Sequence, residues 1–241
     1  MSIATARARR MAIIVFARMS SSRLPGKVLM DFGGRPLLAH IIARAQALDY
    51  PVIVATSDRT EDAAVAEAAR RCGALAYQGA LDNVLQRAVD CAHAHGLDAF
   101  ARLCGDRPYF PVEQMREGLA RMHAALAEGR ALDLATNHLP SNPPPGLSTE
   151  VVRVTALERV LAAGPDARQH EHLTAGIYDN SADFAIAPIT ADFTATGAHR
   201  FAVDTAEDYR VLGQAAARLG DLRASADAVA ALLDQGAGGG R

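Results

Sequence analysis

Residues 11–29 read MAIIVFARMSSSRLPGKVL, a stretch that joins an apolar run directly to a cationic loop. The run Met11–Ala17 is apolar throughout, as expected of a strand that is covered on both faces of a sheet. Three serines, a proline and a glycine then indicate a loop, and Arg18, Arg23 and Lys27 lie within it. The stretch therefore predicts a buried strand followed by a loop that is rich in positive charge.

Helical and strand patterns alternate from this loop as far as residue 137. Leucine and isoleucine repeat at helical spacing in the first helix, and Pro36 suits its first turn. Alternating strands and helices predict an α/β fold, with a mostly parallel sheet and helices on both faces. The predicted strands are 11–17, 51–58, 74–79, 98–106 and 132–137, and the predicted helices are 36–48, 60–73, 81–96 and 111–129.

The pattern is less regular after residue 137. The proline-rich residues 138–148, HLPSNPPPGLS, predict a surface loop. The rest predicts antiparallel strands at 149–154 and 184–189, a last core strand at 199–204, and helices at 206–219 and 225–234. We expect a single domain over 11–234 with an inserted flap at roughly 138–198, a flexible extension at 1–10 and a disordered tail at 235–241.

Composition limits the classes of partner. The 241-residue chain has a net charge of −2 and no tryptophan, which argues against nucleic acid as a ligand. Its N-terminal apolar run is too short for a signal peptide or a membrane span. The three cysteines form no paired motif, which favours a reducing, cytoplasmic location.

Polar clusters follow several predicted strands. They comprise the cationic loop, Thr56–Asp58, Gly105–Asp106 and Asp204. Because ligands of open parallel sheets bind at the carboxyl ends of the strands, we expect these clusters to meet at one edge. Three cations suit a nucleoside triphosphate, which carries about −4 charge, and two aspartates suit Mg²⁺.

Plainer interpretations of these clusters stay open on composition alone. The loop is neither a Walker loop nor a dinucleotide-binding GxGxxG motif, and ordinary surface cations in a solvated turn would give the same composition. Asp106 is also a common type of turn residue. Asp204 is also a plausible N-cap for the helix predicted at 206–219.

Several segments together resemble the cytidylyltransferases related to CMP-Kdo synthetase, in particular the spore coat polysaccharide SpsF type. The resemblance begins with ARMSSSRLPGKVLMDFGGRPLLAHII and continues through VIVATSD, YQGALDNVLQRAVDCA, ARLCGDRPYF, PPGLSTEVV, QHEHLTAGIY and HRFAVDTAEDYRVL. It covers most of residues 12–212. It implies a GT-A-like (Rossmann-like) three-layer sandwich with a small antiparallel flap, and a homodimer. The implied reaction is Mg²⁺-dependent transfer of CMP from CTP to an anionic acceptor, with release of pyrophosphate.

The resemblance also implies roles for individual residues. Arg18, Lys27, Asp106 and Asp204 would be catalytic, and the two aspartates would hold Mg²⁺. The implied nucleotide-binding residues are Ala17, Arg18, Ser22, Arg23, Lys27, Thr56, Asp58, Gly79, Asp82, Arg87 and Gly105. The implied acceptor-binding residues are Arg107, Asn137, Glu150, Glu171 and His172.

Three positions depart from the family pattern. Ser20 stands where glycine is usual, Arg107 where a small or neutral residue is common, and Ser148 where aspartate is frequent. The last two concern the acceptor, which is an acidic sugar or a phosphonate or phosphate of a natural-product pathway. The alternatives are a glycosyltransferase that uses a nucleotide-sugar, for which an Asp-x-Asp motif is missing, and a non-catalytic nucleotide-binding subunit.

Overall fold

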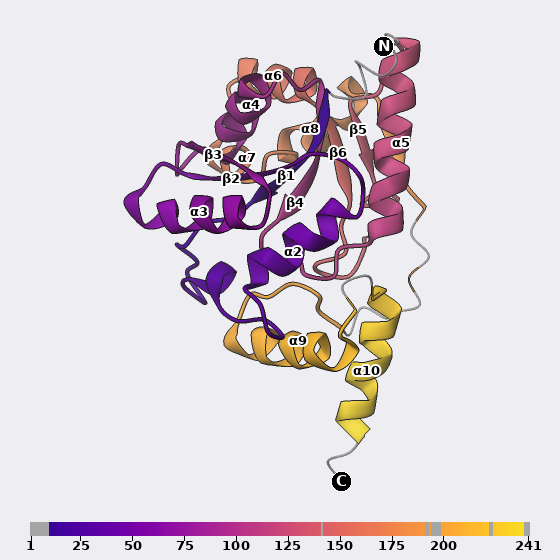
Figure 1. Cartoon of the computed structure of the whole chain (residues 1–241). Helices are drawn as coiled ribbons and strands as arrows, with labels where there is room; N and C mark the ends of the chain where they lie inside the picture. Colours follow the sequence, from indigo (N-terminus) through magenta and orange to yellow (C-terminus); the bar gives the residue numbers. More distant parts are fainter. Residues whose placement is uncertain (1–9, 141, 191–192, 194–198, 222–223, 239–241) are drawn as a thin grey trace.

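A seven-stranded sheet forms the centre of the protein (Figure 1). The computed structural model describes residues 10–140, 142–190, 193, 199–221 and 224–238. The strands are β1 (Met11–Phe16), β2 (Val52–Ser57), β3 (Leu75–Gly79), β4 (Ala99–Cys104), β5 (Leu134–Thr136), β6 (Glu150–Arg153) and β7 (Ile186–Pro188). Their spatial order is β3-β2-β1-β4-β6-β5-β7.

The sheet is mostly parallel, as predicted. Strands β1, β2, β3 and β4 pair in parallel, and β5 pairs in parallel with β7. Strand β6 is antiparallel to both of its neighbours, β4 and β5. The antiparallel part of the fold is therefore a strand of the same sheet, and it lies next to the central strand β4. The expectation of a second antiparallel strand at 184–189 is wrong, because this segment forms β7 and pairs in parallel with β5.

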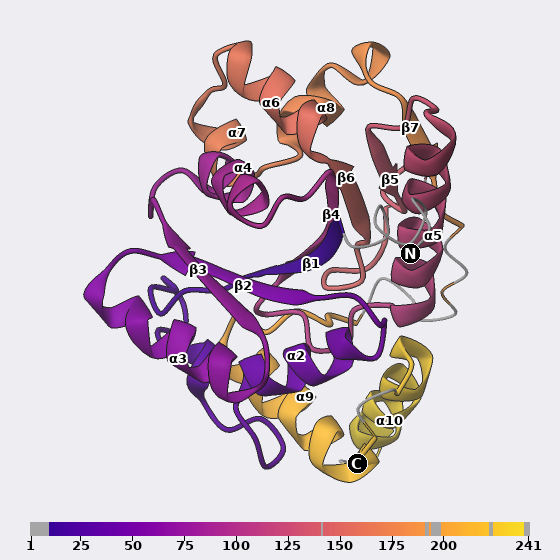
Figure 2. The ribbon, with the colours of Figure 1, turned by 45° about the horizontal axis from the view of Figure 1, so that its top comes forward.

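Helices cover both faces of the sheet, which confirms the three-layer sandwich (Figure 2). Neighbouring residues of β1 show why both faces are apolar: Ile13 belongs to one buried cluster and Ile14 to the other. The Ile13 cluster includes residues of α2 (Leu37–Gln46), α3 (Ala63–Arg71), α5 (Val112–Glu128), α9 (Ala206–Leu219) and α10 (Ala226–Gly238). The Ile14 cluster includes residues of α4 (Val84–Ala94), α6 (Val154–Ala162) and α8 (Ala175–Asp179).

Short helices complete the fold. The 3₁₀ turn η1 (Lys27–Leu29) ends the cationic loop, and η2 (Thr60–Asp62) precedes α3. A third such turn is η3 (Ser181–Asp183), and α7 (Ala167–Glu171) is a five-residue helix. No helix in the described ranges is both long and apolar enough to cross a membrane.

The strand predicted at 199–204 is wrong. Phe201, Ala202 and Val203 are buried, which explains the strand-like pattern, but the segment forms no ladder with the sheet. Instead, the backbone N–H of Phe201 donates to the carbonyl of Pro145, 2.7 Å away, and that of Val203 donates to the carbonyl of Asp106, 2.8 Å away. The segment is thus held between two loops at the edge where the sheet ends.

Gly146 permits one of these contacts. Its φ of +98° lies in the left-handed region, and a Cβ at this position would lie 2.3 Å from the carbonyl carbon of Phe201. Any larger residue would push the 199–204 segment away. The proline-rich loop, which is irregular as predicted, can therefore pack directly against the segment that leads to Asp204.

The ends of the chain differ in part from expectation. Helix α10 continues to Gly238 and so includes the first four residues of the tail expected to be disordered. Residues 239–241 lie outside the described residues, as does the predicted extension apart from Arg10. Arg10 forms an ion pair with Asp98, with Nη2 2.6 Å from Oδ1.

Candidate functional site

A cavity of about 1130 Å³ opens at the carboxyl ends of β1 and β4. The cationic loop, the Gly105–Arg107 turn, the proline-rich loop, α7 and the segment before α9 all contribute to its walls. The predicted site residues that line it are Ala17, Arg18, Ser22, Arg23, Lys27, Arg87, Gly105, Asp106, Arg107, Glu171, His172 and Asp204. The edge expected from the topology therefore carries a real cavity.

A buried carboxylate holds the cationic loop in place. Asp62 is 1% exposed, and its Oδ1 accepts a hydrogen bond from the backbone N–H of Met19 at 2.6 Å. Its Oδ2 accepts a hydrogen bond from the Ser57 hydroxyl at the end of β2. Gly26, with φ of +73°, closes the loop by donating its N–H to the carbonyl of Met19. The loop is therefore fixed to β2 at its start and turns back on itself before η1.

Gly105 brings β4 close to β1 at the edge of the cavity. Its N–H donates to the carbonyl of Phe16 at 2.8 Å, and a Cβ would lie 2.8 Å from that of Ala17. A larger residue would separate the two strand ends. This close approach places Asp106 beside the cationic loop.

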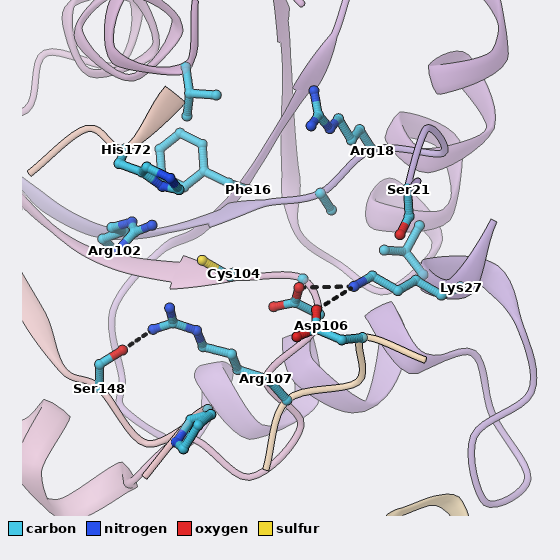
Figure 3. Close-up of a pocket in the computed structure, with 18 of the residues that line it drawn as sticks. Phe16, Arg18, Ser21, Lys27, Arg102, Cys104, Asp106, Arg107, Ser148 and His172 are labelled. Atoms are coloured by element: carbon cyan, nitrogen blue, oxygen red, sulfur yellow. Dashed lines mark hydrogen bonds and ion pairs between the residues drawn. The ribbon is translucent and has the colours of Figure 1, made fainter. Parts of the chain in front are cut away.

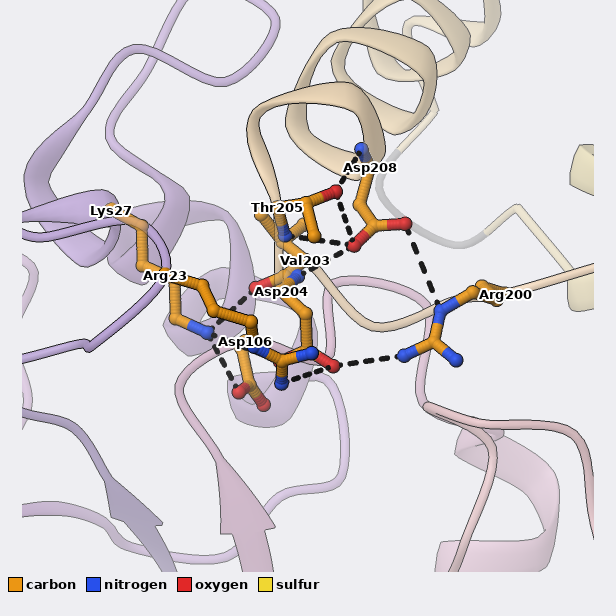
Figure 4. A network of polar contacts seen from close by, with 8 residues as sticks. All are labelled: Arg23, Lys27, Asp106, Arg200, Val203, Asp204, Thr205 and Asp208. Carbon is orange, nitrogen blue, oxygen red and sulfur yellow. Dashed lines mark hydrogen bonds and ion pairs between the residues drawn. The ribbon is translucent and has the colours of Figure 1, made fainter.

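Asp106 and Asp204 converge on one cation, the Lys27 ammonium (Figure 4). Lys27 Nζ lies 2.9 Å from Asp106 Oδ2 and 3.6 Å from Asp204 Oδ1, and it also donates to the carbonyl of Val203 at 2.6 Å. The Lys27 residue is only 7% exposed. Two carboxylates that lie far apart in the sequence thus share one partly buried position.

The structure removes the alternative role of Asp204 as a helix cap. Thr205 is the N-cap of α9 and forms a capping box with Asp208. The Asp204 carboxylate instead faces Arg23, with Nη2 3.1 Å from Oδ2, and Arg200, with Nη2 2.9 Å from the same oxygen. Its side chain therefore caps no helix and instead faces cations at the cavity wall.

These two aspartates fit a divalent metal. Both direct an oxygen toward a position that already attracts a cation. Mg²⁺ is held in enzymes of phosphoryl chemistry by one or two carboxylates, with phosphate oxygens and waters completing the octahedron. In the described ranges there is no group of three or more His, Cys, Asp or Glu that could hold a metal, so the remaining ligands would have to come from substrate and water.

Arg18 and Arg87 lie on the side of the cavity toward β1 and α4. Arg18 Nη2 lies 3.2 Å from Glu171 Oε1, which joins the cationic loop to α7. Arg87 is buried and donates to the carbonyls of Ala80 and Leu81. Burial lowers the pKa of Arg87, and the positive charge of Arg18 adds to this effect.

Arg107 and two histidines lie on another side of the cavity. Arg107 donates a hydrogen bond to the Ser148 hydroxyl (Figure 3). His138 and His172 also line the cavity. Burial lowers the pKa of His138, and the charges of Arg107 and Arg102 add to this effect although Glu150 opposes it. The lowered pKa favours the neutral form of His138.

Asn137 and Glu150, expected to bind the acceptor, do not line the cavity. Asn137 is fully buried; its amide donates to the Leu147 carbonyl at 2.9 Å and accepts from the Thr149 N–H at 2.8 Å. Glu150 is 2% exposed and forms an ion pair with Arg102, with Oε2 2.5 Å from Nη1. Both side chains are satisfied within the protein and support the cavity wall from behind.

Four residues expected on the nucleoside side also lie away from the lining. Thr56 is fully buried in β2, and Gly79 ends β3. The Asp58 N–H donates to the Gly79 carbonyl at 2.9 Å, and the side chains of Asp58 and Asp82 are exposed. The structure therefore does not bring these four to the cavity.

The cavity also contains residues that were not expected. Arg102, Cys104, Phe16 and Ser21 line it. The signal for Arg102 was present in the sequence, since an arginine interrupts the otherwise apolar run AFARLC of β4. A charged residue in a buried strand needs a partner, and this one finds Glu150 on β6.

The cavity is electropositive although the chain is not. Among the described residues that line it, six are arginine or lysine and three are aspartate or glutamate. The chain as a whole has a net charge of −2. A concave surface with excess positive charge attracts anions, and polyphosphates more than singly charged ligands.

A family model described as cytidylyltransferase matches residues 12–212. The chain belongs to the cytidylyltransferase family. The matched range contains the cationic loop, both aspartates and every other lining residue of the cavity. This cytidylyltransferase is therefore a CTP-dependent nucleotidyltransferase, which confirms the expected enzyme class over the glycosyltransferase and the non-catalytic subunit.

Individual relatives agree with the family. The spore coat polysaccharide biosynthesis protein SpsF of Bacillus subtilis (strain 168) is 30% identical over 226 residues, which cover 88% of the cytidylyltransferase described here and 90% of SpsF. The solved structure of a cytidylyltransferase from Leptospira borgpetersenii serovar Hardjo-bovis (strain JB197) has a TM-score of 0.84 at 22% identity and covers 95% of each chain. A CMP:2-keto-3-deoxy-manno-octonic acid synthetase solved with CTP has a TM-score of 0.66 at 22% identity, covering 87% of this chain and 99% of the synthetase.

Proposed function

We propose that the enzyme transfers CMP from CTP to a small anionic acceptor and releases pyrophosphate, with a divalent metal, Mg²⁺, at Asp106 and Asp204. The observation that carries the proposal is the convergence of both aspartates on Lys27 at the edge of an electropositive cavity. This arrangement combines metal ligands and phosphate ligands in one place. The acceptor is an acidic sugar or a phosphonate or phosphate.

The cationic loop binds the triphosphate in this proposal. Arg18, Arg23 and Lys27 supply positive charge, and Ser22 supplies a hydroxyl donor on the same wall. At an effective dielectric constant of 20, the Coulomb attraction of two unit charges about 4 Å apart is roughly 4 kcal/mol before the cost of desolvation is subtracted. Lys27 and Arg23 already contact the aspartates. With the metal at the aspartates, both cations would lie next to the phosphate groups whose charge changes during transfer.

When bound, the metal neutralises phosphate charge and polarises the α-phosphate. Asp106 and Asp204 would hold it, and Lys27 would then turn its ammonium from the carboxylates to phosphate oxygens. Lys27 and Arg18 stabilise the negative charge that develops on the departing pyrophosphate. Positioning and charge stabilisation supply most of the acceleration in such reactions.

The acceptor approaches the α-phosphorus from the side of Arg107 and His172. Its oxygen attacks in line with the leaving pyrophosphate, so a bond from phosphorus to the acceptor forms as the bond to the β-phosphate oxygen breaks. An acceptor that is already ionised, such as a phosphonate, needs no general base. Asn137 and Glu150 support this wall from behind and make no contact with the acceptor.

Release of pyrophosphate tests the proposal. Pyrophosphate is measured by coupled pyrophosphatase with CTP, Mg²⁺ and a panel of anionic acceptors. Asp106→Asn and Asp204→Asn should each reduce turnover on the order of 100-fold or more, while Asp90→Asn on α4 serves as the matched control. If both variants still released pyrophosphate when an acceptor is added, the metal site would be refuted. If the wild type released no pyrophosphate with any acceptor, the transfer reaction would be refuted.

A homodimer in the cytoplasm completes the proposal. The three free cysteines, Cys72, Cys91 and Cys104, agree with a reducing compartment. Size-exclusion chromatography with light scattering should give twice the chain mass of 25.4 kDa. A monomer at micromolar concentration would refute the dimer and leave the proposed reaction untouched.

A further inference from the structure

Arg102 presents a guanidinium with unused hydrogen-bonding capacity at the cavity. The side chain is 15% exposed and lines the cavity from β4. Nη1 donates to Glu150 Oε2 at 2.5 Å, whereas the buried Nε has no hydrogen-bond partner among the described residues. Because Nε is buried, a ligand in the cavity would contact the other N–H groups of this guanidinium, and hydrogen bonds from a charged donor to an anion are stronger than those between neutral groups.

Glu150 fixes the orientation of Arg102. Its Oε2 accepts from Arg102, and its Oε1 accepts from the Thr174 hydroxyl at 2.8 Å and the Tyr178 hydroxyl at 2.9 Å. Both carboxylate oxygens thus have partners within the protein, and Glu150, at 2% exposed, does not line the cavity. A guanidinium held on one edge by such a network is preorganised for a second anion.

The surroundings of Arg102 carry excess positive charge. Arg107 lines the same wall and forms no ion pair with any described residue, since its hydrogen bond is to the neutral Ser148. Glu150 therefore balances only one of the two guanidinium groups. One further negative charge, from a ligand, would balance the second.

This wall is separate from the cations assigned to the triphosphate. Arg18, Arg23 and Lys27 follow β1, whereas Arg102 lies on β4 and pairs across to β6, on the other side of β4 from β1. In Figure 3, Arg102 and His172 lie apart from the Lys27–Asp106 pair, and Arg107, which follows Asp106 directly, points its guanidinium toward Ser148. A ligand group that contacts Arg102 would therefore belong to the acceptor rather than to the nucleotide.

We infer that Arg102 recognises the anionic group of the acceptor, a carboxylate or a phosphonate, and that Glu150, Thr174 and Tyr178 position it for this task. The inference rests on the proposed function, which supplies the acceptor. Arg102 is the specificity-determining residue, and Glu150 acts through it. A planar guanidinium binds either anion through two parallel hydrogen bonds, which a lysine cannot reproduce.

Isothermal titration of the full chain tests the inference. The probes are 2-keto-3-deoxy-manno-octonic acid for the carboxylate and 2-hydroxyethylphosphonate for the phosphonate, with glucose as an uncharged ligand. Each is titrated with and without an α,β-methylene analogue of CTP, which cannot transfer CMP. The wild type should bind at least one anion, and the anion it binds identifies the acceptor class.

Three variants give the comparison. Arg102→Lys keeps the charge opposite Glu150 and should weaken anion binding at least tenfold, with less than a twofold change for the CTP analogue. Glu150→Gln should weaken anion binding at least threefold through loss of orientation. Arg121→Lys on the surface of α5 is the matched control and should bind as the wild type does.

Steady-state kinetics give a second readout. With the anion that supports turnover, Arg102→Lys should raise the KM for the acceptor and leave the KM for CTP unchanged. General destabilisation of the protein would not change one KM without the other.

The outcomes separate the two proposals. The inference is overturned if the wild type binds neither anion, if Arg102→Lys binds the anion as tightly as the wild type, or if it loses the CTP analogue equally. Arg102-dependent anion binding without any binding of the CTP analogue would instead support the anion subsite and refute the proposed function.

Discussion

Val203 donates its backbone N–H to the carbonyl of Asp106 across 2.8 Å, and this contact joins the two chain segments that carry the acidic pair. Asp106 follows β4, whereas Asp204 follows a segment that belongs to no strand. Without the contact, nothing in the sheet would fix the second carboxylate. The geometry of the acidic pair therefore depends on backbone hydrogen bonding outside the sheet.

Replacement of Lys27 by methionine should expose the repulsion within the acidic pair. Turnover should fall on the order of 100-fold, because a charge that stabilises the transition state is lost. In the absence of nucleotide, Mn²⁺ should raise the Tm of Lys27→Met more than that of the wild type, because the metal then replaces the missing ammonium. Thermal unfolding with and without Mn²⁺ measures this, and Arg70→Met at the exposed end of α3 is the control. An equal Mn²⁺ effect in both proteins would contradict the shared cation position.

Replacement of Asp62 by alanine should release the cationic loop. The change removes the acceptor for the Met19 N–H and the Ser57 hydroxyl, and a buried unsatisfied donor costs roughly 1–3 kcal/mol of unfolding free energy. Because the loop is less fixed, we expect the KM for CTP to rise about tenfold. Denaturant unfolding and steady-state kinetics measure the two effects. The neighbouring exposed Glu61→Ala should change neither, and an unchanged CTP KM in Asp62→Ala would show that the tether is dispensable.

The stabilising contribution of Glu150 to the free energy of unfolding should be lost in acid. Burial alone would raise its pKa, but the charge and hydrogen bond of Arg102 and the hydrogen bond of Thr174 outweigh burial and lower it to about 2, from an ordinary 4.5. The contribution to stability is therefore complete above about pH 4.5 and is lost as the pH falls toward 2. Its size at neutral pH is about 3 kcal/mol.

Denaturant unfolding at pH 7, 5 and 3 measures this contribution. Glu150→Gln should be less stable than the wild type at pH 7 and 5, and the difference should shrink at pH 3. The exposed Glu128→Gln, whose partner is Arg130, is the control for a surface pair. A constant difference between wild type and Glu150→Gln at all three pH values would contradict the lowered pKa.

Replacement of Gly146 by alanine should disturb the site from a distance. Both Gly146 and Gly164 have positive φ, but only Gly146 has backbone atoms where a Cβ would lie. Gly164→Ala should therefore cost about 1 kcal/mol of unfolding free energy through backbone strain alone, and Gly146→Ala should cost more. Because the displaced segment carries Asp204, turnover should fall in Gly146→Ala only. Equal stability and equal activity of the two variants would refute the packing argument.

Local patterns predicted most of the fold because a strand covered on both faces is mostly apolar, as β1 is over its whole length and β2 is over its first four residues. They did not predict that β6 lies between β4 and β5. Strand order is decided by tertiary contacts, which do not affect the spacing of apolar residues along the sequence. The strand prediction for residues 199–204 was wrong for a related reason. Its burial arises from packing against loops, and burial alone does not distinguish this from a strand.

The site was predictable where its residues follow strands and less so elsewhere. The cationic loop and Asp106 come directly after β1 and β4, so topology places them together. Asp204 was ambiguous between a ligand and a cap until Thr205 was seen to take the cap. Glu150 carries a charge that suggests a ligand contact, but its partner Arg102 lies on another strand, and only the register of β4 against β6 reveals the pair.

The ion pair of Arg18 with Glu171 links the cationic loop to α7 across the mouth of the cavity. A single surface carboxylate is a weak competitor for a guanidinium, since exposed pairs contribute only about 0–1 kcal/mol. If Arg18 binds the triphosphate as proposed, the nucleotide would displace Glu171 at little energetic cost, and the freed carboxylate would be repelled by the phosphate charge. Binding of the nucleotide and release of α7 from the cationic loop would then be one exchange of ionic partners.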